Sequence, residues 1–173
     1  AESLSINPVQ VRKDLASISS EPGRPKLGFR IDSLLSDLKS YLGYDRYDEA
    51  VLIGVGSLGH VLMQYNGFDA YGLGIVAGFD ILPKEKSIAG KPVLPMSKLA
   101  STLSKLKIKI GIIAVPPREA QGIADILVDN GVEAIWNFAP TTLDLPEGLI
   151  VKNENLAASL AALTTELHKR KDI

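Results

Sequence analysis

The sequence predicts an α/β protein in which a doubly wound parallel sheet is preceded by a small helical domain. From residue 50 onward, short apolar runs alternate with segments of helical periodicity, which is typical of a parallel sheet covered by helices on both faces. The residues before it carry two helical patterns separated by a turn-rich loop. With 173 residues, the chain is long enough for one full α/β domain and a small appendage.

Composition and charge exclude several classes of function for this chain. Apolar residues make up 46% of the chain and charged residues 23%, the balance of an ordinary globular protein. The net charge of −1 gives no overall basic field, so nucleic-acid binding has to come from a local patch. With no cysteine and two histidines, disulfides, thiolate nucleophiles and a metal site are not expected. No apolar run is long enough to span a bilayer, and we expect a cytoplasmic protein with no membrane partner.

The first helical pattern lies over residues 8–18. Asn7 can cap this helix, the proline that follows suits its first position, and the Gln10 side chain can reach back to complete a capping box. Residues 1–5 suit the tail of an earlier helix joined by a short turn, which is the spacing of a helix-turn-helix. The chain starts with Ala1 and not with Met, so we expect residues upstream of it to be missing.

A basic loop and a second helix follow. Residues 19–30 contain several turn formers together with the cations Arg24 and Lys26, which predicts an exposed basic hairpin or loop. Leucines share one face of a helix over residues 32–42, which ends at a glycine. Residues 44–49 are polar and are expected to link two domains.

The remaining residues give the elements of the sheet domain. We place its strands at residues 50–54, 73–79, 93–95, 108–115, 133–138 and 149–152. Helices fit between them at residues 57–66, 97–106 and 117–130, with a last helix at residues 154–170.

The motif that carries the chemistry follows the first of these strands, which runs directly into Gly-Val-Gly-Ser-Leu-Gly and then a helix. Gly54 allows the tight turn, Gly56 lets the backbone approach a pyrophosphate, and Gly59 permits close packing of helix on strand. The helix start, with Ser57 and Leu58, offers unpaired N–H groups and a positive dipole end to the phosphates. The sequence therefore predicts a Rossmann-type domain that binds a dinucleotide.

An acidic residue at the end of the second strand points to the kind of dinucleotide. Asp80 lies about 20 residues past the glycines, where a carboxylate accepts hydrogen bonds from the ribose hydroxyls of adenosine and repels a 2′-phosphate. This favours NAD(H) over NADP(H). The alternative is that Asp80 only ends its strand and caps a turn before Pro83.

Two further loops are expected at the same edge of the sheet. In the strand order 3-2-1-4-5-6, the ligand lies over the switch point between the first and fourth strands, so Val115 and Pro116 should face the cofactor. Phe138, Ala139 and Pro140 come to this edge after the fifth strand. They either line the nicotinamide site or only lead the chain out of the strand.

Other candidates have simpler interpretations. His60 follows the last glycine and is expected to be a packing residue near the helix dipole, not a catalyst. Tyr65 ends the helix after the glycine loop, where it either packs or reaches a neighbouring subunit, and we include it among the expected cofactor-binding residues. The sheet closes near Lys152 and one helix remains, so nothing obvious is left to hold a substrate. We therefore expect the nucleotide to be sensed and not consumed, and the chain not to be an enzyme.

Taken together, these motifs give a family resemblance. The chain resembles Rex, the bacterial redox-sensing transcriptional repressors, over nearly its whole length. The matching segments are residues 7–15, 54–59, 64–68, 114–116, 137–140 and 145–148. The resemblance implies a homodimer whose winged-helix domains bind operator DNA when NAD⁺ is abundant and release it when NADH binds.

The resemblance also implies roles for regions of this chain. Gln10, Arg12 and Lys13 would lie on the recognition helix, and Arg24 and Lys26 on the wing, where they neutralise phosphates or reach base edges. An ordinary solvated basic face is the alternative. The last helix, with leucines at helical spacing, would swap between subunits to make the dimer, or it packs on its own sheet. The implied domains are a partial winged-helix domain (1–43), a linker (44–49), the NAD(H)-binding Rossmann domain (50–153) and a dimerisation helix (154–173).

The chain departs from the family pattern in two places, and two other functions are also compatible with its sequence. The upstream helices of the winged-helix domain are absent from the sequence. Many relatives have Asn-Val-Asp-Leu before the last helix, whereas this chain has Asn155 in place of the aspartate, which affects the coupling of nicotinamide state to dimer closure. The other functions are a CoA-binding domain similar to a succinyl-CoA synthetase subunit and a fragment of an NAD-dependent dehydrogenase.

Overall fold

The computed structural model describes residues 5–24 and 27–169. The chain forms two compact units. The first unit comprises Ala1–Tyr47 and Gly67–Gly72, and the second comprises Asp48–Asn66 and Leu73–Ile173. Sequence patterns did not predict that residues 67–72 join the N-terminal unit.

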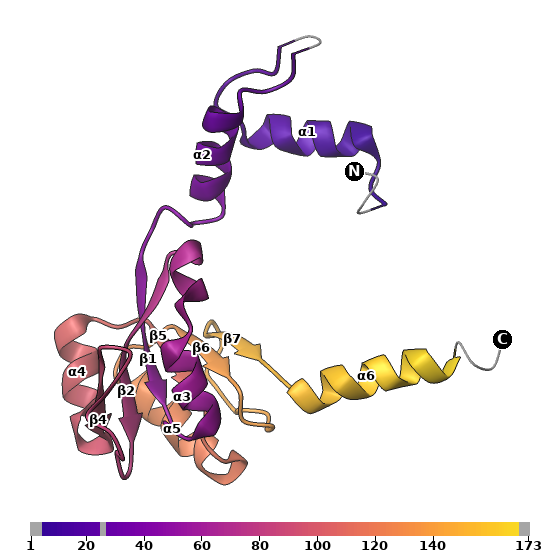
Figure 1. The fold of residues 1–173 in the computed structure, drawn as a ribbon. Helices are drawn as coiled ribbons and strands as arrows, with labels where there is room; N and C mark the ends of the chain where they lie inside the picture. Colours follow the sequence, from indigo (N-terminus) through magenta and orange to yellow (C-terminus); the bar gives the residue numbers. More distant parts are fainter. Residues whose placement is uncertain (1–4, 25–26, 170–173) are drawn as a thin grey trace. The chain divides into compact units, whose positions relative to one another are not determined.

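The second unit is built on a seven-stranded sheet with the order β3-β4-β2-β1-β5-β6-β7 (Figure 1). Its strands are β1 (Asp48–Ile53), β2 (Leu73–Asp80), β3 (Ser87–Ile88), β4 (Lys91–Pro95), β5 (Ile110–Ile113), β6 (Ala134–Asn137) and β7 (Ile150–Asn153). All neighbouring strands pair in parallel except β3, which is antiparallel to β4. Without β3 the order is the 3-2-1-4-5-6 that the sequence predicted, and the doubly wound α/β fold is confirmed.

Strand boundaries differ from the sequence predictions for two reasons. β1 begins at Asp48, inside the segment expected to be a linker, because strand pairing with β2 uses backbone groups and does not require apolar side chains. β5 is shorter than expected at both ends. Ile108 before it and Val115 after it are apolar because they pack into the core from loops, not because they lie in the strand.

Helices cover the sheet and close the core. These are α3 (Ser57–Gln64), α4 (Leu99–Leu106) and α5 (Pro117–Asp129), with the 3-10 turn η3 (Met96–Lys98). A further 3-10 turn, η2 (Asn66–Tyr71), belongs almost entirely to the first unit. The last four residues of β1 are buried, as expected for a central strand with helices on both faces. Its neighbours pack Phe79 and Ile112 into the same core.

The N-terminal unit contains α1 (Pro8–Ile18) and α2 (Ile31–Tyr41). The Asn7 side chain caps α1 by accepting a hydrogen bond from the Val9 amide at 2.8 Å, as predicted. The capping-box prediction for Gln10 is wrong: its amide instead donates to Asp14 Oδ1 at 2.7 Å, one turn along the same face.

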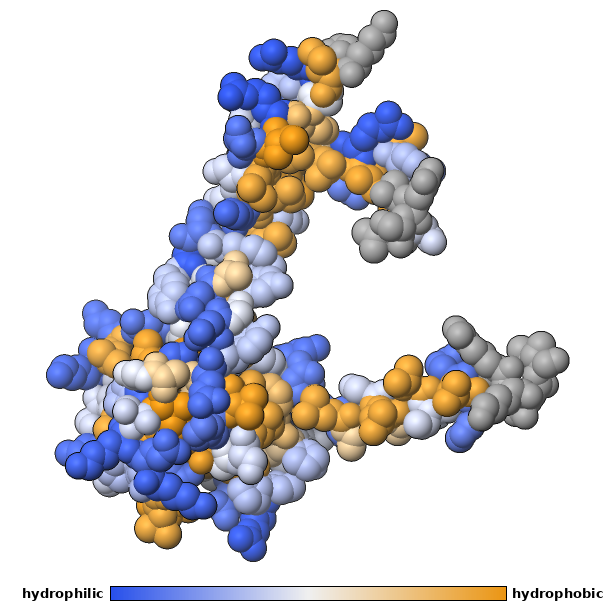
Figure 2. Space-filling model, viewed as in Figure 1, coloured by the Kyte–Doolittle hydropathy of each residue, from blue (hydrophilic) through white to orange (hydrophobic). Residues whose placement is uncertain are grey.

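The last helix, α6 (Leu156–Lys169), begins slightly later than predicted. Asn155 ends the preceding loop and accepts a hydrogen bond from the Ala158 amide at 2.9 Å, so it caps the helix. None of the described α6 residues is buried, and Figure 2 shows hydrophobic residues spread along the helix.

The described residues contain neither a membrane-spanning helix nor a metal-binding cluster. No helix there is long and apolar enough to cross a membrane. No group of three or more His, Cys, Asp or Glu residues is placed to hold a metal ion in that part of the chain.

Candidate functional site

The turn after β1 requires a glycine at its first position. Gly54 has φ +94, in the left-handed region that L side chains rarely adopt. A Cβ atom on it would lie 2.5 Å from the carbonyl oxygen of Ala114 in the loop after β5. Its amide donates to the Phe79 carbonyl at 2.8 Å, which ties the loop to β2. The loop therefore sits at the switch point between strands β1 and β5, as predicted.

The other two glycines of the loop differ in what surrounds them. A Cβ on Gly59 would overlap the carbonyl oxygen of Gly54, so close contact between helix and loop depends on its absence. A Cβ on Gly56 would meet no atom within 4 Å. Gly56 is the N-cap residue of α3, and no described side chain caps this helix. The amides that open α3 are thus exposed to an open space beside Ser57, where an anion can bind.

Asp80 holds the glycine loop against the end of β2. Its Oδ2 accepts a hydrogen bond from the Val55 amide at 2.8 Å, and its Oδ1 accepts one from the Leu82 amide at 3.0 Å. The second bond is the turn cap considered as the alternative role. Because a carboxylate has about four acceptor positions, these two bonds leave capacity for ribose hydroxyls. The two roles of Asp80 are therefore compatible.

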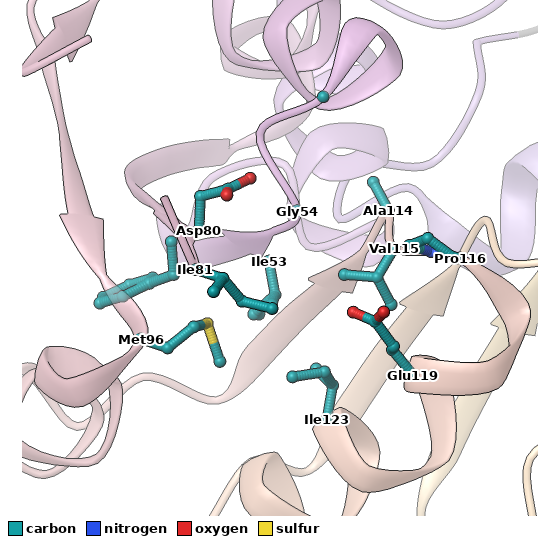
Figure 3. Close-up of a pocket in the computed structure, with 12 residues that line it drawn as sticks. Ile53, Gly54, Asp80, Ile81, Met96, Ala114, Val115, Pro116, Glu119 and Ile123 are labelled. Carbon is teal, nitrogen blue, oxygen red and sulfur yellow. The ribbon is translucent and has the colours of Figure 1, made fainter. Parts of the chain in front are cut away.

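A hollow of about 210 Å³ opens beside the loop (Figure 3). Most of its wall is apolar, and it also contains two carboxylates, those of Asp80 and Glu119. Its lining residues are Ile53, Gly54, Gly56, Phe79, Asp80, Ile81, Met96, Ala114, Val115, Pro116, Glu119 and Ile123. An apolar slot with a few polar groups at the switch point has the chemistry of a purine site.

A second hollow, also about 210 Å³, shares Gly56 and Asp80 with the first. It is more polar, and its wall includes Ser57, Lys84 and His60. His60 Nε2 lies 3.2 Å from Glu85 Oε1. The histidine is therefore placed beside the helix start, with a carboxylate as its partner.

The third hollow, about 250 Å³, lies after β6 and includes Ala139, Pro140 and Asn155 in its wall. Asn137, which is fully buried, shapes the loop beside it. Its amide nitrogen donates to the carbonyls of Ala139 (3.2 Å) and Thr141 (3.0 Å) and to Asn153 Oδ1 (2.8 Å), and its oxygen accepts from the Ala139 amide at 3.0 Å.

Sequence reasoning placed Asn137 at the start of the segment expected to line the nicotinamide site but gave its side chain no role of its own, although an asparagine closing an apolar strand is a usable signal of a buried polar junction. Phe138 packs on Trp136, with ring centroids 4.6 Å apart. The loop that was expected to wall the nicotinamide is thus held by side-chain packing on one side and by the asparagine on the other.

Four expected cofactor residues line none of these three hollows: Leu58, Gly59, Phe138 and Tyr65. Tyr65 follows the far end of α3, is more than half exposed and lines none of the three. Leu58 is half-buried in the first turn of α3.

The candidate DNA-binding residues lie in the N-terminal unit. Gln10, Arg12 and Lys13 are exposed on α1, and Arg12 Nε donates to the Pro8 carbonyl at 3.3 Å. The amide and carbonyl of Arg24 bond those of Gly28 at 2.8 and 2.9 Å, which forms a small hairpin as predicted. Lys26 lies outside the described residues.

Comparisons with known proteins give the family. A family model described as a CoA binding domain matches residues 45–141. The redox-sensing transcriptional repressor Rex of Porphyromonas gingivalis is 38% identical over 94% of this chain and 75% of its own length. Rex of Treponema denticola is 37% identical over 99% of this chain and 82% of its own length. The chain belongs to the Rex family.

Solved structures agree with this assignment. RSP, a Rex-family repressor, has been solved in complex with β-NAD⁺ and operator DNA. It matches with a TM-score of 0.87 and 31% identity over 98% of this chain and 79% of RSP. RSP in complex with β-NADH matches with a TM-score of 0.82 and 30% identity, over 98% of this chain and 80% of RSP. Because Rex relatives are transcriptional repressors, the expectation that this chain is not an enzyme is confirmed.

Proposed function

We propose that this Rex-family chain is a redox-sensing repressor that binds operator DNA and is released when NADH binds its Rossmann domain. The observation that carries the proposal is the glycine loop, because open space beside Gly56 and the uncapped start of α3 coincide with the switch point of the sheet. An anion at this point gains amide hydrogen bonds and the helix dipole. RSP, which has this fold, binds both β-NAD⁺ and β-NADH.

The three hollows suggest how a dinucleotide would lie. The adenine occupies the apolar hollow, with its ribose at Asp80. The diphosphate lies against Gly56, and the nicotinamide reaches the loop of Ala139 and Pro140. Val115 and Pro116 form the wall between the two ends. We assign the adenine ribose to Asp80 because a carboxylate accepts from its hydroxyls and repels a 2′-phosphate, so NAD(H) is favoured over NADP(H).

DNA binding is assigned to the N-terminal unit, over residues 1–43. α1 presents Gln10, Arg12 and Lys13 to solvent, which suits the recognition helix of a winged-helix domain. Arg24 lies at the base of the hairpin that would form the wing. The relative RSP binds operator DNA, and this chain is proposed to do so in the same way. Such a repressor acts on the chromosome, and we place it in the cytoplasm.

Dimer formation is assigned to α6. Leu156, Leu160, Leu163 and Leu167 are each more than half exposed and recur at helical spacing, so they form one apolar stripe. A second copy of the chain is the proposed partner, because homodimers offer the same stripe from both subunits. The Asn155 cap at the start of α6 lies in the wall of the third hollow, which connects the proposed nicotinamide end to this helix.

Operator affinity measured with and without NADH tests the proposal. A fluorescently labelled operator of a Rex relative is titrated with the protein, first alone, then with NADH, then with NAD⁺ at the same concentration. We expect NADH to weaken operator binding at least tenfold and NAD⁺ to leave it nearly unchanged. Equal operator affinity under all three conditions would reject the redox-sensing role.

Coenzyme A is the second candidate ligand because the matching family model is described by it. The CoA molecule also carries an adenosine diphosphate, so its diphosphate suits the same helix start. However, its ribose bears a 3′-phosphate, which the carboxylate of Asp80 would repel. Calorimetric titration with CoA beside NADH separates the two: we expect binding of NADH and none of CoA.

A further inference from the structure

Glu119 is a carboxylate inside the apolar hollow that the proposed placement of ribose and diphosphate does not use. It belongs to the first turn of α5, where its amide donates to the Pro116 carbonyl at 3.0 Å. Figure 3 shows its carboxylate directed into the hollow from the side opposite Asp80. Ile53 of β1 lies between the two carboxylates, and Ile123 of α5 lines the hollow below Glu119 in this view.

The partners of Glu119 leave one of its oxygens available. Arg118 Nε lies 3.3 Å from Oε1, and this arginine is almost fully exposed, with 84% of its side chain accessible. The Glu119 side chain is only 35% accessible. Its Oε2 accepts no hydrogen bond from the described residues. A half-buried acceptor aimed into an apolar slot gains most from a ligand that donates a hydrogen bond to it.

Adenine has the matching chemistry. Its faces are apolar, which suits walls such as Ile81, Met96 and Val115, and its edge carries an exocyclic amine that donates hydrogen bonds. An ionised carboxylate is an acceptor only. Hypoxanthine and guanine carry a carbonyl oxygen at the position of this amine, so the carboxylate would face another acceptor and repel it.

We propose that Glu119 selects adenine as the base of the bound dinucleotide by accepting a hydrogen bond from its exocyclic amine. The inference rests on the proposed function, because it requires a dinucleotide in this hollow. Asp80 then recognises the ribose at one side of the hollow, and Glu119 recognises the base at the other. The base is thus recognised by a carboxylate from α5, and the sugar by a carboxylate from β2.

The test compares two ligands that differ at this edge of the base: adenine carries the amine, whereas hypoxanthine carries a carbonyl oxygen there and a proton on the neighbouring ring nitrogen. The dissociation constants of NADH and of reduced nicotinamide hypoxanthine dinucleotide are measured by dihydronicotinamide fluorescence on the wild-type chain. A glutamine at this position keeps the shape of Glu119 but carries both a donor and an acceptor, so it can pair with either base. The same two constants are therefore measured on Glu119→Gln. Glu147→Gln, an exposed glutamate outside the hollow, is the matched control.

We expect the wild-type chain and Glu147→Gln to bind NADH at least about tenfold more tightly than the hypoxanthine analogue, and Glu119→Gln to bind the two within about threefold. The ratio is taken on one sample of each variant, so a change in folded fraction cancels. Equal affinities in the wild-type chain, or an unchanged ratio in Glu119→Gln, would overturn the proposal while leaving NADH binding intact. If neither dinucleotide bound the wild-type chain, the proposed function would fail, and this inference with it.

Discussion

The second and third glycines of the loop, Gly56 and Gly59, should respond in opposite ways to the same added methyl group. Gly59→Ala places its Cβ against the Gly54 carbonyl oxygen and 3.0 Å from Leu52 Cδ2, in the packed junction of α3 and β1. Overpacking of this kind costs about 1–3 kcal/mol. At about 2–4 °C per kcal/mol for a chain of this size, the melting temperature should fall by about 2–12 °C.

Gly56→Ala should leave the fold intact and weaken the binding of NADH. Its φ of −77 and ψ of −162 are extended backbone that alanine adopts, and no atom lies within 4 Å of the new Cβ. Alanine is a poorer N-cap residue than glycine by up to about 1 kcal/mol. The lower chain entropy of the unfolded state offsets this by about 0.4–1 kcal/mol.

The methyl group of Gly56→Ala, however, occupies the space proposed for the diphosphate. Each lost hydrogen bond to a charged group is worth about 1.5–3 kcal/mol, so NADH affinity should fall roughly ten- to hundredfold.

Both variants are assayed by thermal melting without ligand and by NADH fluorescence titration. We predict that Gly59→Ala melts at a lower temperature than the wild-type chain, whereas Gly56→Ala melts with the wild-type chain but binds NADH roughly ten- to hundredfold more weakly. A Gly59→Ala protein as stable as the wild-type chain, or a Gly56→Ala protein with unchanged NADH affinity, would refute it.

Three further predictions test the other parts of the proposed sensor. Asp80→Asn removes the negative charge at the proposed ribose site, so titrations should show a tenfold or larger fall in the preference for NADH over NADPH, and an unchanged preference would argue against this placement. Leu160→Glu introduces a charge into the apolar stripe of α6, where burying a leucine is worth about 1.5–3 kcal/mol in each subunit. Sedimentation should then show a monomer, whereas Thr165→Glu, on the opposite face of the helix, should remain dimeric, and a dimer in both would exclude α6 as the interface. Arg12→Ala and Lys13→Ala each remove a cation from α1, so each should weaken operator binding and lower the slope of log affinity against log salt by about 1. A salt slope equal to that of the wild-type chain would mean that the residue does not contact a phosphate.

The parts of the fold that depend on local periodicity were predictable. The alternation of apolar runs and helices gave the parallel sheet and its strand order, and the glycine spacing gave the switch-point loop. β3 was missed because a strand of two residues has no periodicity to detect. The attachment of residues 67–72 to the N-terminal unit was missed because it depends on tertiary contacts, such as the edge-to-face pair of Tyr44 and Tyr71, whose centroids lie 5.2 Å apart.

The site was predictable where a motif fixes a residue's role and not where contacts fix it. Asp80 could be placed near a ribose from its spacing, but its bond to the Val55 amide joins residues far apart in sequence and requires the folded sheet. Glu119 belongs to no motif, and Asn137 belongs to a segment of the family resemblance that does not indicate what its side chain does. The asparagine gains its role from four hydrogen bonds around the loop after β6. The glutamate gains its role from the direction of one helical side chain.

The measurement closest to the central claim is direct titration of the purified protein with NADH, followed by dihydronicotinamide fluorescence and repeated with Gly56→Ala. We predict saturable binding of one NADH per wild-type chain and a curve for the variant shifted to at least tenfold higher NADH concentration. Absence of any binding by the wild-type chain, or the same curve for both proteins, would contradict a dinucleotide seated on the amides at the start of α3.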